Sequence, residues 1–401
     1  MKEKIAIIGG GPAAMILATE LDSKKYEVTL FEKMPTIGRK FLVAGKGGFN
    51  LTHSEDRESM IGRYQPKSFF EPVLNHFDNK KLRNWLASLN IETFIGSSKR
   101  VFPVKGIKPI DVLSAIKKKI IQNNVKIIAN HEWLGWNDEN QLLFKAKGGD
   151  IIIEAELVIF ALGGASWTKT GSDGNWATLF QKKGINILPF QASNCAYKIK
   201  WKEAFISKNE GNPLKNISIK CENKIQKGEV VITKFGLEGG AIYALSPEIR
   251  KQLNSRKKAE IFIDLKPTLE LPEIITRLSK TRNSKSWTQH IETQLKLNKT
   301  SIALIKNYIT KEDFNNIEKF AFQLKNLPLI IKNFAPIDEA ISTVGGIALG
   351  EIDENFQLKK LPNNFVVGEM LDWDAPTGGY LLQACFSMGK CLADHLNQLK
   401  I

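Results

Sequence analysis

Long apolar stretches are missing from this 401-residue chain. None approaches the roughly 18 consecutive apolar residues that a membrane-spanning helix requires. The apolar run Ile5–Ile8 is short and leads into three glycines, unlike the longer apolar segment of a secretory signal. The composition, 43% apolar and 25% charged, is ordinary for a globular protein. We therefore expect a protein of the cytoplasm that does not bind a membrane.

Cysteine is also scarce. The four cysteines, Cys195, Cys221, Cys385 and Cys391, form no C-x-x-C pair and no spacing typical of a zinc site. A free cysteine usually behaves as a small apolar side chain. The sequence therefore predicts no metal centre and no dithiol redox relay.

Arginine supplies only nine of the 57 basic residues, although the formal net charge is +15. Surfaces that bind nucleic acid specifically usually concentrate arginine, because the guanidinium group matches phosphates and base edges. Here lysine dominates, and clusters such as Lys117–Lys119 lie at the solvated end of a helical pattern. We therefore expect a small-molecule substrate and no specific nucleic-acid partner.

The length exceeds that of one ordinary domain. Buried strands that alternate with helices occupy both ends of the chain and favour a first domain made of residues 1–190 and 331–401. Short alternating strands indicate an inserted β-rich domain over 191–265. Periodic apolar residues indicate a small helical domain over 266–330. The predicted class is α/β, with a Rossmann-like domain interrupted by two smaller domains.

A glycine-rich turn follows the first expected strand and opens the first expected helix. It comprises Gly9, Gly11, Pro12, Ala13 and Ala14, which fit the pattern G-x-G-x-x-A. In this pattern the first glycine permits the tight turn, the second lets the backbone approach a pyrophosphate, and the alanine lets helix and strand pack closely. Glu32 ends the second expected strand, where a carboxylate accepts hydrogen bonds from ribose hydroxyls and repels a 2′-phosphate. The sequence therefore predicts a dinucleotide site.

A second glycine turn lies near the other end of the chain, after the apolar run Phe365–Val367. Gly378 and Gly379 open the last helix, and we expect the N–H groups at Gly379 and Tyr380 to point at the N1–C2=O edge of a flavin, where negative charge gathers on reduction. Gly368 and Glu369 follow the strand directly, and Glu369 is placed to bond a ribityl chain. Because FAD must be held at both ends, a second turn favours FAD over NAD.

Several stretches of the chain carry a resemblance to a known family. They are GGGPAAM, GRKFLVAGKGGFNLTH, KRVFPVKG, VIFALGGAS, TKFGLEGGAIYALS, TVGGIAL and GEMLDWDAPTGGYLLQA. In this order the chain resembles the BaiN-type, or aminoacetone-oxidase-family, FAD-binding flavoproteins of bacteria, which are also described as NAD(FAD)-utilising dehydrogenase-like. The resemblance implies a Rossmann-like FAD domain of the two-dinucleotide-binding-domain type, with an inserted β-barrel and a small helical domain. Phe49 stands where many relatives carry cysteine.

Further residues are candidates for contact with the cofactor because they lie in glycine-rich segments or carry charge near the expected pyrophosphate. They are Lys33, Arg39, Lys40, Gly45, Lys46, Gly47, Gly48, Asn50, Leu51, Gly163 and Gly164. The glycines let the backbone pass close to the cofactor, and Arg39 has a head group that matches phosphate. No residue marks itself as a covalent flavin attachment site, so we expect non-covalent FAD. The weaker candidates for catalysis are Lys46, Tyr243 and Asp374.

The function that these observations favour is an FAD-dependent oxidoreductase. Better-studied relatives reduce conjugated double bonds of steroid-like substrates, so the resemblance implies reduction of an activated C=C bond in a small, largely apolar molecule. No second G-x-G-x-x-G motif is present, so NAD(P)H would dock transiently as the donor. The alternatives are an amine or aminoketone oxidase that uses dioxygen, an RNA-modifying flavoprotein, and a flavin-binding protein without turnover.

Overall fold

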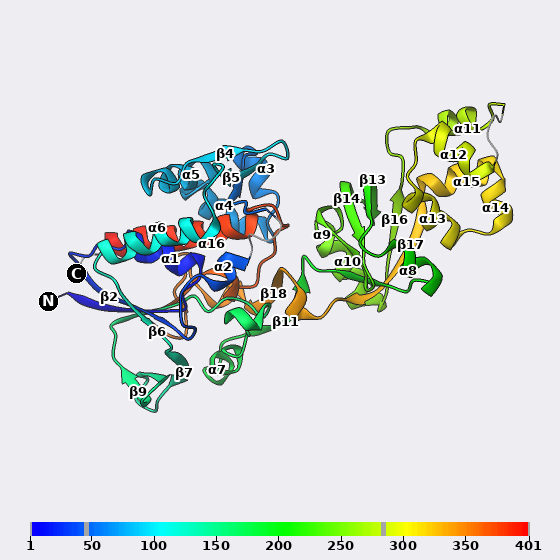
Figure 1. Ribbon diagram of the computed structural model, residues 1–401. Coiled ribbons are helices and arrows are strands. Elements are labelled where there is room, and N and C mark those ends of the chain that lie inside the picture. The colour runs from blue at the N-terminus through cyan, green and yellow to red at the C-terminus, as the bar shows by residue number, and fades with distance from the viewer. Residues whose placement is uncertain (1, 44–47, 282–285, 400–401) are drawn as a thin grey trace. The chain divides into compact units, whose positions relative to one another are not determined.

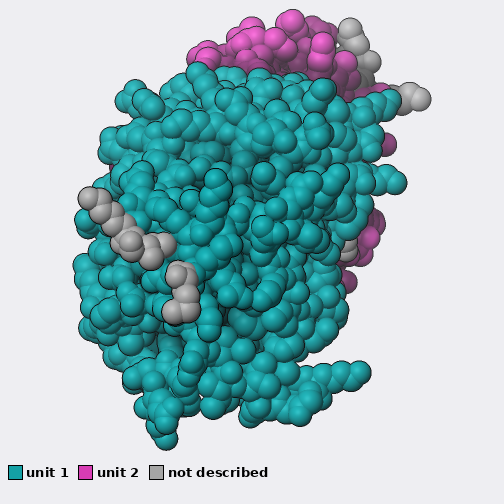
Figure 2. All heavy atoms as spheres, turned by 90° about the vertical axis from the view of Figure 1, so that its left-hand side faces the viewer, with its two compact units in different colours: residues 1–193, 337–401 teal, residues 194–336 magenta. Residues whose placement is uncertain are grey.

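The computed structural model describes residues 2–43, 48–281 and 286–399. The chain divides into two compact units, drawn in separate colours in Figure 2. Unit 1 comprises residues 1–193 and 337–401, and unit 2 comprises residues 194–336. The chain therefore leaves unit 1, builds unit 2 and returns. Within the described residues, no helix is both long and apolar enough to cross a membrane.

Unit 1 is built on a parallel sheet with the strand order β19-β10-β1-β2-β6. The strands are β1 (Glu3–Ile8), β2 (Tyr26–Glu32), β6 (Lys126–Ala129), β10 (Leu157–Phe160) and β19 (Asn364–Val366). The chain runs outward from β1 to β2 and β6, then returns to add β10 on the other side of β1. Open α/β sheets bind their ligands at such a reversal, beyond the carboxyl ends of the strands. The expected Rossmann-like fold is confirmed.

Three helices of unit 1 pack together beside this sheet (Figure 1): α1 (Pro12–Glu20), α6 (Pro109–Gln122) and α16 (Tyr380–Gln398). Residues 13–19 of α1 are all buried, because the helix is enclosed by the sheet and by both neighbouring helices. In α16, a Cβ on Gly389 would run into the carbonyl oxygen of Ala13. The glycine thus lets the last helix approach the first one closely.

Three small antiparallel sheets, which the sequence does not predict, complete unit 1. They are β3 (Thr52–His53) with β5 (Arg100–Pro103) and β4 (Thr93–Ile95), the meander β7 (Glu132–Trp136), β8 (Leu142–Ala146) and β9 (Gly149–Ile153), and the pair β11 (Ile187–Ser193) and β18 (Ser342–Ile347). The remaining helices are α2 (Arg39–Val43), α3 (Arg57–Ile61), α4 (Lys67–His76), α5 (Asn79–Ser88) and α7 (Ala177–Lys182). Short 3₁₀ turns occur at Thr168–Thr170, Ile337–Glu339, Leu349–Glu351 and Gly368–Met370.

The apolar pattern over residues 71–90 fits one long helix, but the structure has two helices there, α4 and α5. Asp78 lies between them, and its side chain accepts hydrogen bonds from the backbone N–H groups of Lys80 and Lys81. An aspartate in this position starts a new helix, because it satisfies N–H groups that have no partner within the helix. The apolar period continued across the break and concealed it.

Unit 2 is a closed six-stranded barrel with appended helices. The strands follow the order β12-β15-β14-β13-β16-β17 and are β12 (Tyr197–Ile199), β13 (Pro213–Cys221), β14 (Lys224–Ile232), β15 (Gly236–Glu238), β16 (Ala259–Asp264) and β17 (Leu327–Phe334). The helices are α8 (Glu203–Asn209), α9 (Gly240–Tyr243), α10 (Ser246–Arg256), α11 (Leu271–Leu278), α12 (Trp287–Leu295), α13 (Lys299–Tyr308), α14 (Lys311–Asn315) and α15 (Ile317–Lys325). Strand β17 follows the helical segment and closes the barrel, so the barrel draws on residues beyond 191–265.

Candidate cofactor site

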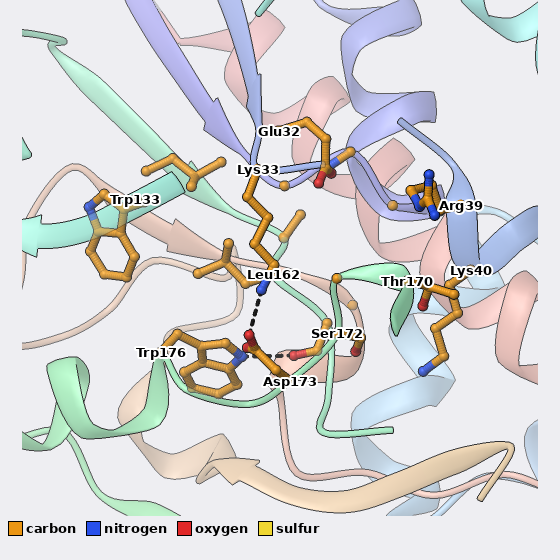
Figure 3. A pocket seen from close by; sticks show the side chains of 18 of the residues that line it. Glu32, Lys33, Arg39, Lys40, Trp133, Leu162, Thr170, Ser172, Asp173 and Trp176 are labelled. Carbon is orange, nitrogen blue, oxygen red and sulfur yellow. Dashed lines mark hydrogen bonds and ion pairs between the residues drawn. The ribbon is translucent and has the colours of Figure 1, made fainter. Parts of the chain in front are cut away.

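A cavity of about 320 Å³ lies where the strand order of the parallel sheet reverses. Its walls come from the first glycine turn, the end of β2 and the loop after it, residues 131–134, parts of 161–179, and residues 367–369. Figure 3 shows that charged side chains from several of these segments surround it. The size and the place of this cavity are those of a ligand site.

The first glycine turn leaves room for a phosphate. Gly9 has a φ of +100°, and a Cβ there would lie 2.5 Å from the carbonyl oxygen of Ala161, so the turn closes tightly on the end of β10. At Gly11, a Cβ would meet Ala161 only at 3.9 Å. Gly11 is also the N-cap of α1, and no side chain caps that helix. The first N–H groups of α1 thus suit an anion beside the cavity.

The helix that follows this turn divides its residues between the cavity and the core. Pro12 and Ala13 line the cavity. Ala14 is fully buried, as expected of the position where helix and strand approach each other.

Glu32 is held by the backbone at the end of β2. Its Oε2 accepts a hydrogen bond from Gly10 N at 2.8 Å, and its Oε1 accepts one from Met34 N at 2.8 Å. Burial raises the pKa of Glu32, while the two backbone hydrogen bonds oppose that shift. Each carboxylate oxygen has a further lone pair. A carboxylate fixed in this way at a cavity wall is ready to accept hydrogen bonds from ribose hydroxyls.

Two basic side chains at the cavity differ in what they already bind. Lys33 Nζ lies 2.7 Å from Asp173 Oδ2, which ties the end of β2 to the segment after β10 (Figure 3). Arg39 Nε is buried and has no hydrogen-bond partner among the described residues. Leaving a buried donor unpaired costs about 1–3 kcal/mol. Arg39 therefore offers a donor that no described residue uses, and such a donor suits a pyrophosphate.

Glu369 stands at another wall of the cavity, where the second glycine-bearing segment begins. Lys40 Nζ lies 2.9 Å from Glu369 Oε2 and 3.0 Å from Ser166 Oγ. Gly368 has a φ of +84°, and a Cβ there would lie 3.4 Å from the Cβ of Ala13. The segment after β19 therefore meets the helix that follows the first glycine turn. The structure brings Gly368, Glu369 and Lys40 to the same cavity as Glu32.

The glycine pair after β10 serves two purposes. Gly163 lines the cavity with a φ of +75°. A Cβ on Gly164 would instead collide with the hydroxyl of Thr343 in β18. Packing within unit 1 accounts for the missing side chain at Gly164 without a ligand.

The turn at Gly378 and Gly379 lies outside the residues that line this cavity. Gly379 has a φ of +103°, and a Cβ there would lie 2.5 Å from the backbone of Thr52 in β3. Contact with the protein therefore already requires glycine at this position. Gly379 is the N-cap of α16, and no side chain caps that helix. Its first N–H groups keep the capacity that we assigned to them.

The side chain of Tyr380 is engaged within unit 1. Its hydroxyl donates to Glu55 Oε1 at 2.7 Å, and its ring stacks on His53 with the centroids 5.2 Å apart. Its carbonyl oxygen accepts from the hydroxyl of Tyr64 at 2.8 Å. Burial and the hydrogen bond to Glu55 raise the pKa of Tyr380 above its usual value. Only the backbone N–H of Tyr380 remains as a donor to a cofactor.

The glycine-rich segment before β3 is described in part. Gly45, Lys46 and Gly47 lie outside the described residues. Gly48 is exposed with a φ of +107°, and its carbonyl oxygen accepts from Asn50 N at 2.9 Å. Leu51 is fully buried, and its N–H donates to Val101 O at 2.8 Å, so it packs in the core and joins the segment to β5.

The two candidates for catalysis that the structure describes lie in different units. Asp374, in unit 1, is 6% exposed and accepts from Ser193 Oγ at 2.8 Å and from Ala375 N at 3.0 Å. Such a carboxylate holds the core together. Tyr243, in unit 2, is half-buried, and burial raises its pKa to about 12. Neither residue lines the cavity.

Sequence reasoning missed part of the cavity wall. Residues 131–134, 170–173, 175 and 176 contribute to it, including Trp133, Ser172 and Trp176 (Figure 3). These residues lie in the β7 meander and in an irregular segment, neither of which has a periodic pattern. The indole Nε1 of Trp133 is buried without a partner among the described residues. The sequence does not indicate that this donor is unpaired.

Comparison with known proteins gives the family. The family model described as the HI0933-like protein Rossmann domain matches residues 3–395. The chain is 25% identical to the 3-dehydro-bile acid delta(4,6)-reductase of Clostridium scindens, over 96% of this chain and 97% of that protein. It is 24% identical to the ribosomal RNA dihydrouridine synthase of Haemophilus influenzae, over 95% of each chain.

Solved structures support the fold. The 3-ketosteroid delta1-dehydrogenase of Sterolibacterium denitrificans aligns over 99% of this chain and 100% of its own, with a TM-score of 0.54 at 11% identity. The Sdh1 complex of Mycobacterium smegmatis aligns over 100% of this chain and 69% of its own, with a TM-score of 0.51 at 13% identity. The cavity, the unused donor of Arg39 and the fixed carboxylate of Glu32 fit the expected FAD. The chain belongs to the HI0933-like Rossmann family and is an FAD-dependent oxidoreductase.

Proposed function

We propose that the protein reduces an activated C=C bond, with FAD as its redox cofactor and NAD(P)H as its donor. One observation carries the proposal. Two relatives that match nearly the whole chain differ in substrate, yet their names denote the same chemistry. A delta(4,6)-reductase saturates a double bond, and dihydrouridine is uridine whose ring double bond has gained two hydrogens. The shared reaction is therefore a better guide to this chain than either substrate.

The residues at the cavity would hold the adenosine and pyrophosphate of FAD. Glu32 would accept from the ribose, Arg39 and the start of α1 would bind the pyrophosphate, and Glu369 would accept from the ribityl chain, which weakens its bond to Lys40. Bound FAD supplies hydride transfer. The uncapped start of α16 would favour negative charge on the cofactor by about 0.3–1 kcal/mol, or up to about 2 when partly buried.

Rapid mixing without oxygen tests this function. The FAD-loaded protein is mixed with NADH or NADPH, and then with a cyclic enone such as cyclohexenone. We expect flavin absorbance to bleach with one nicotinamide and to return when the enone is added. If an aminoketone rather than NAD(P)H bleaches the flavin, and only dioxygen reoxidises it, the oxidase alternative would be established instead. No bleaching with any donor would leave a flavin-binding protein without turnover.

A second candidate, reduction of uridine in RNA, is favoured by the distribution of charge. Unit 2 carries 26 of the 57 basic residues and 14 of the 42 acidic residues, a net charge of +12. The rest of the chain has a net charge of +3 on the same count. The positive charge is thus concentrated in unit 2. Concentrated positive charge attracts the phosphate backbone.

The RNA candidate has its own test. Ribosomal RNA transcripts are incubated with the protein, FAD and NADPH, digested, and assayed for dihydrouridine by mass spectrometry. The expectation of no specific nucleic-acid partner requires weak binding that is lost steeply with salt, and no product. A complex that survives moderate salt, together with dihydrouridine at a defined position, would contradict that expectation and identify RNA as the substrate.

A further inference from the structure

The sheet β3–β5–β4 carries aromatic and charged side chains on one face. His53 of β3 pairs with Arg100 of β5, and Phe94 of β4 pairs with Phe102 of β5. Residues directly paired in an antiparallel sheet share a face, and so do alternate residues along a strand. His53, Arg100, Phe102 and Phe94 therefore lie on one face, which we call the aromatic face.

The opposite face of this sheet is packed against the protein at β3 and β5, whereas Ile95 of β4 on that face is 49% exposed. Thr52 and Val101 are fully buried, and Thr52 Oγ1 lies within hydrogen-bond distance of Gln383 Oε1 in α16, at 2.6 Å. At β5 the aromatic face is more open than the opposite face, and at β4 it is exposed as well. Phe94 is 46% exposed, and Arg100 and Phe102 are half-buried. The aromatic face is thus free to contact a ligand.

The aromatic face borders both glycine-rich segments that the sequence assigned to the flavin. A Cβ on Gly378 would lie 3.5 Å from Arg100 Nε. A Cβ on Gly48 would lie 3.6 Å from the ring of Phe102. His53 stacks on Tyr380, the first residue of α16. Three contacts therefore join the aromatic face to the start of α16 and to the described end of the glycine loop.

Arg100 differs from its neighbour Arg63. The guanidinium of Arg63 forms two hydrogen bonds to Glu55, at 3.1 and 2.9 Å. Across the residues that the structure describes, the Arg100 guanidinium has no hydrogen bond or ion pair. A half-buried arginine retains its charge and its fork of donors, and partial burial strengthens its attraction for an oxygen with negative charge. Arg100 is therefore a binding group without a partner in the described part of the chain.

We propose that the aromatic face holds the reducible substrate, with Phe94 and Phe102 against a planar ring and Arg100 bonded to the carbonyl oxygen conjugated to its double bond. This inference rests on the proposed function and names its substrate class. Cyclic enones and uracil both contain a C=C bond conjugated to C=O in a planar ring. Aromatic side chains bind such rings by stacking.

Arg100 acts on the charge that develops during reduction. The substrate gains a hydride at its β-carbon, with the two electrons supplied by NAD(P)H through the cofactor. The π electrons of the double bond shift toward the carbonyl oxygen, which becomes an enolate oxygen. The α-carbon then takes a proton from water, and the carbonyl reforms. Arg100 keeps its own protons throughout and stabilises the enolate oxygen by charge and hydrogen bonding.

Binding of para-chlorophenol tests the proposal without turnover, because its phenolate copies the ring and the oxygen of the enolate. The probe is titrated into the FAD-loaded protein by calorimetry and by flavin absorbance. Arg100→Gln should raise the Kd of the phenol about 10- to 100-fold, as expected on loss of a charged hydrogen bond. Arg57→Gln is the control, because it removes the same charge from an exposed residue of α3.

Phe94→Ala gives a second measurement. Because the Phe94 side chain is largely exposed, its removal should not unfold the protein. It should raise the Kd of the phenol about 2- to 10-fold, which corresponds to the loss of one aromatic contact. Phe322→Ala, at a residue of α15 that is 53% exposed, is the matched control. Neither Phe variant should alter FAD affinity. Unchanged phenol affinity in both Arg100→Gln and Phe94→Ala would overturn the proposal.

Turnover assays distinguish a failure of this inference from a failure of the proposed function on which it rests. If wild-type protein reduces neither cyclohexenone nor uridine in an oligonucleotide, the proposed function fails, and the phenol titration still decides whether the aromatic face binds a planar oxyanion. If wild-type protein reduces one of them, that substrate is identified. Arg100→Gln should then lower kcat/KM for it at least about 10-fold, while Arg57→Gln should leave it unchanged. Equal kcat/KM in both variants would contradict a role for Arg100.

Discussion

Glu32 and Glu369, the two acidic residues that we assign to the cofactor, are held in different ways. Glu32 accepts hydrogen bonds from two backbone N–H groups that lie within or beside its own βαβ unit, those of Gly10 and Met34. Glu369 is held by the side chain of Lys40, more than 300 residues away in the sequence. The end that we assign to adenosine is thus built by local backbone geometry. The end that we assign to the flavin depends on tertiary contacts between segments far apart in the chain.

This difference explains which end the sequence could describe. A glycine turn and a carboxylate at the end of the next strand are short-range features with fixed spacing. At the other end, Gly378 and Gly379 meet β3 and β5, whose place beside the turn follows only from the folded structure. The following substitutions, given in order of decreasing expected effect, test whether the two ends of the site contribute independently to cofactor binding and stability.

The largest effect is expected at Gly379. Gly379→Ala adds a Cβ 2.5 Å from the backbone of Thr52 at a φ of +103°. Overpacking and backbone strain each cost about 1–3 kcal/mol, so the free energy of unfolding should fall by about 2–6 kcal/mol and FAD should be lost with it. Denaturant unfolding checks this. Gly350→Ala, where a Cβ would meet nothing within 4 Å, is the control. Normal stability with weakened FAD binding would instead place the flavin, rather than Thr52, against Gly379.

The next effect concerns the pyrophosphate. Arg39→Gln removes the charge and the buried Nε donor, which has no partner among the residues that the structure describes. Affinity for FAD and for ADP should fall alike, by about 10- to 100-fold, because both ligands contain the pyrophosphate. Calorimetric titration of the apoprotein measures both. A loss confined to FAD would move Arg39 to the flavin end and remove the distinction between the two ends.

A smaller effect is expected at the edge of the cavity. Lys33→Ala breaks the pair with Asp173, whose two side chains are each 24% exposed. Because solvent screens such pairs, FAD affinity should change by less than about 1 kcal/mol. Lys126→Ala, which breaks a more exposed pair with Glu27, provides the comparison and should have no effect on FAD. A tenfold loss with Lys33→Ala would show that this pair closes the cavity over the adenosine.

The smallest effect is a dependence of stability on pH at the flavin end. Burial lowers the pKa of His53 from its ordinary value of 6.5. Since the folded state then resists protonation more than the unfolded state, stability should fall as the pH drops below about 6.5. His53→Gln should reduce that fall when denaturant unfolding is compared at about pH 7.5 and about pH 5.5. An identical fall in both proteins would mean that other groups cause it.

Much of unit 1 could be predicted because its signals are local. Continuous apolar strands and a helix that begins at Pro12 fixed the Rossmann-like fold, and the family resemblance supplied the barrel, both of which are confirmed. The expectation of FAD is confirmed as well. These features depend on hydrophobic period and on glycine spacing, which a sequence displays directly.

The remainder could not be predicted because it depends on long-range contacts. Strands β3 and β7 have only two and five residues, too few for a clear alternation. Gly164 and Gly379 were assigned to the cofactor. In the structure, however, a Cβ on Gly164 would collide with Thr343, and a Cβ on Gly379 would collide with Thr52. A sequence shows that glycine is present, but not which atom excludes a side chain.

The central claim is that a single FAD extends between the two ends, and ligands of different length test it most directly. The apoproteins of Glu32→Ala and Glu369→Ala are titrated with FAD and with ADP, which contains only the adenosine end. Glu32→Ala should weaken both ligands by about 1–3 kcal/mol. Glu369→Ala should weaken FAD by a similar amount and leave ADP bound no more weakly than in the wild type. Equal losses of FAD and ADP in Glu369→Ala, or unchanged FAD binding in both variants, would contradict the account.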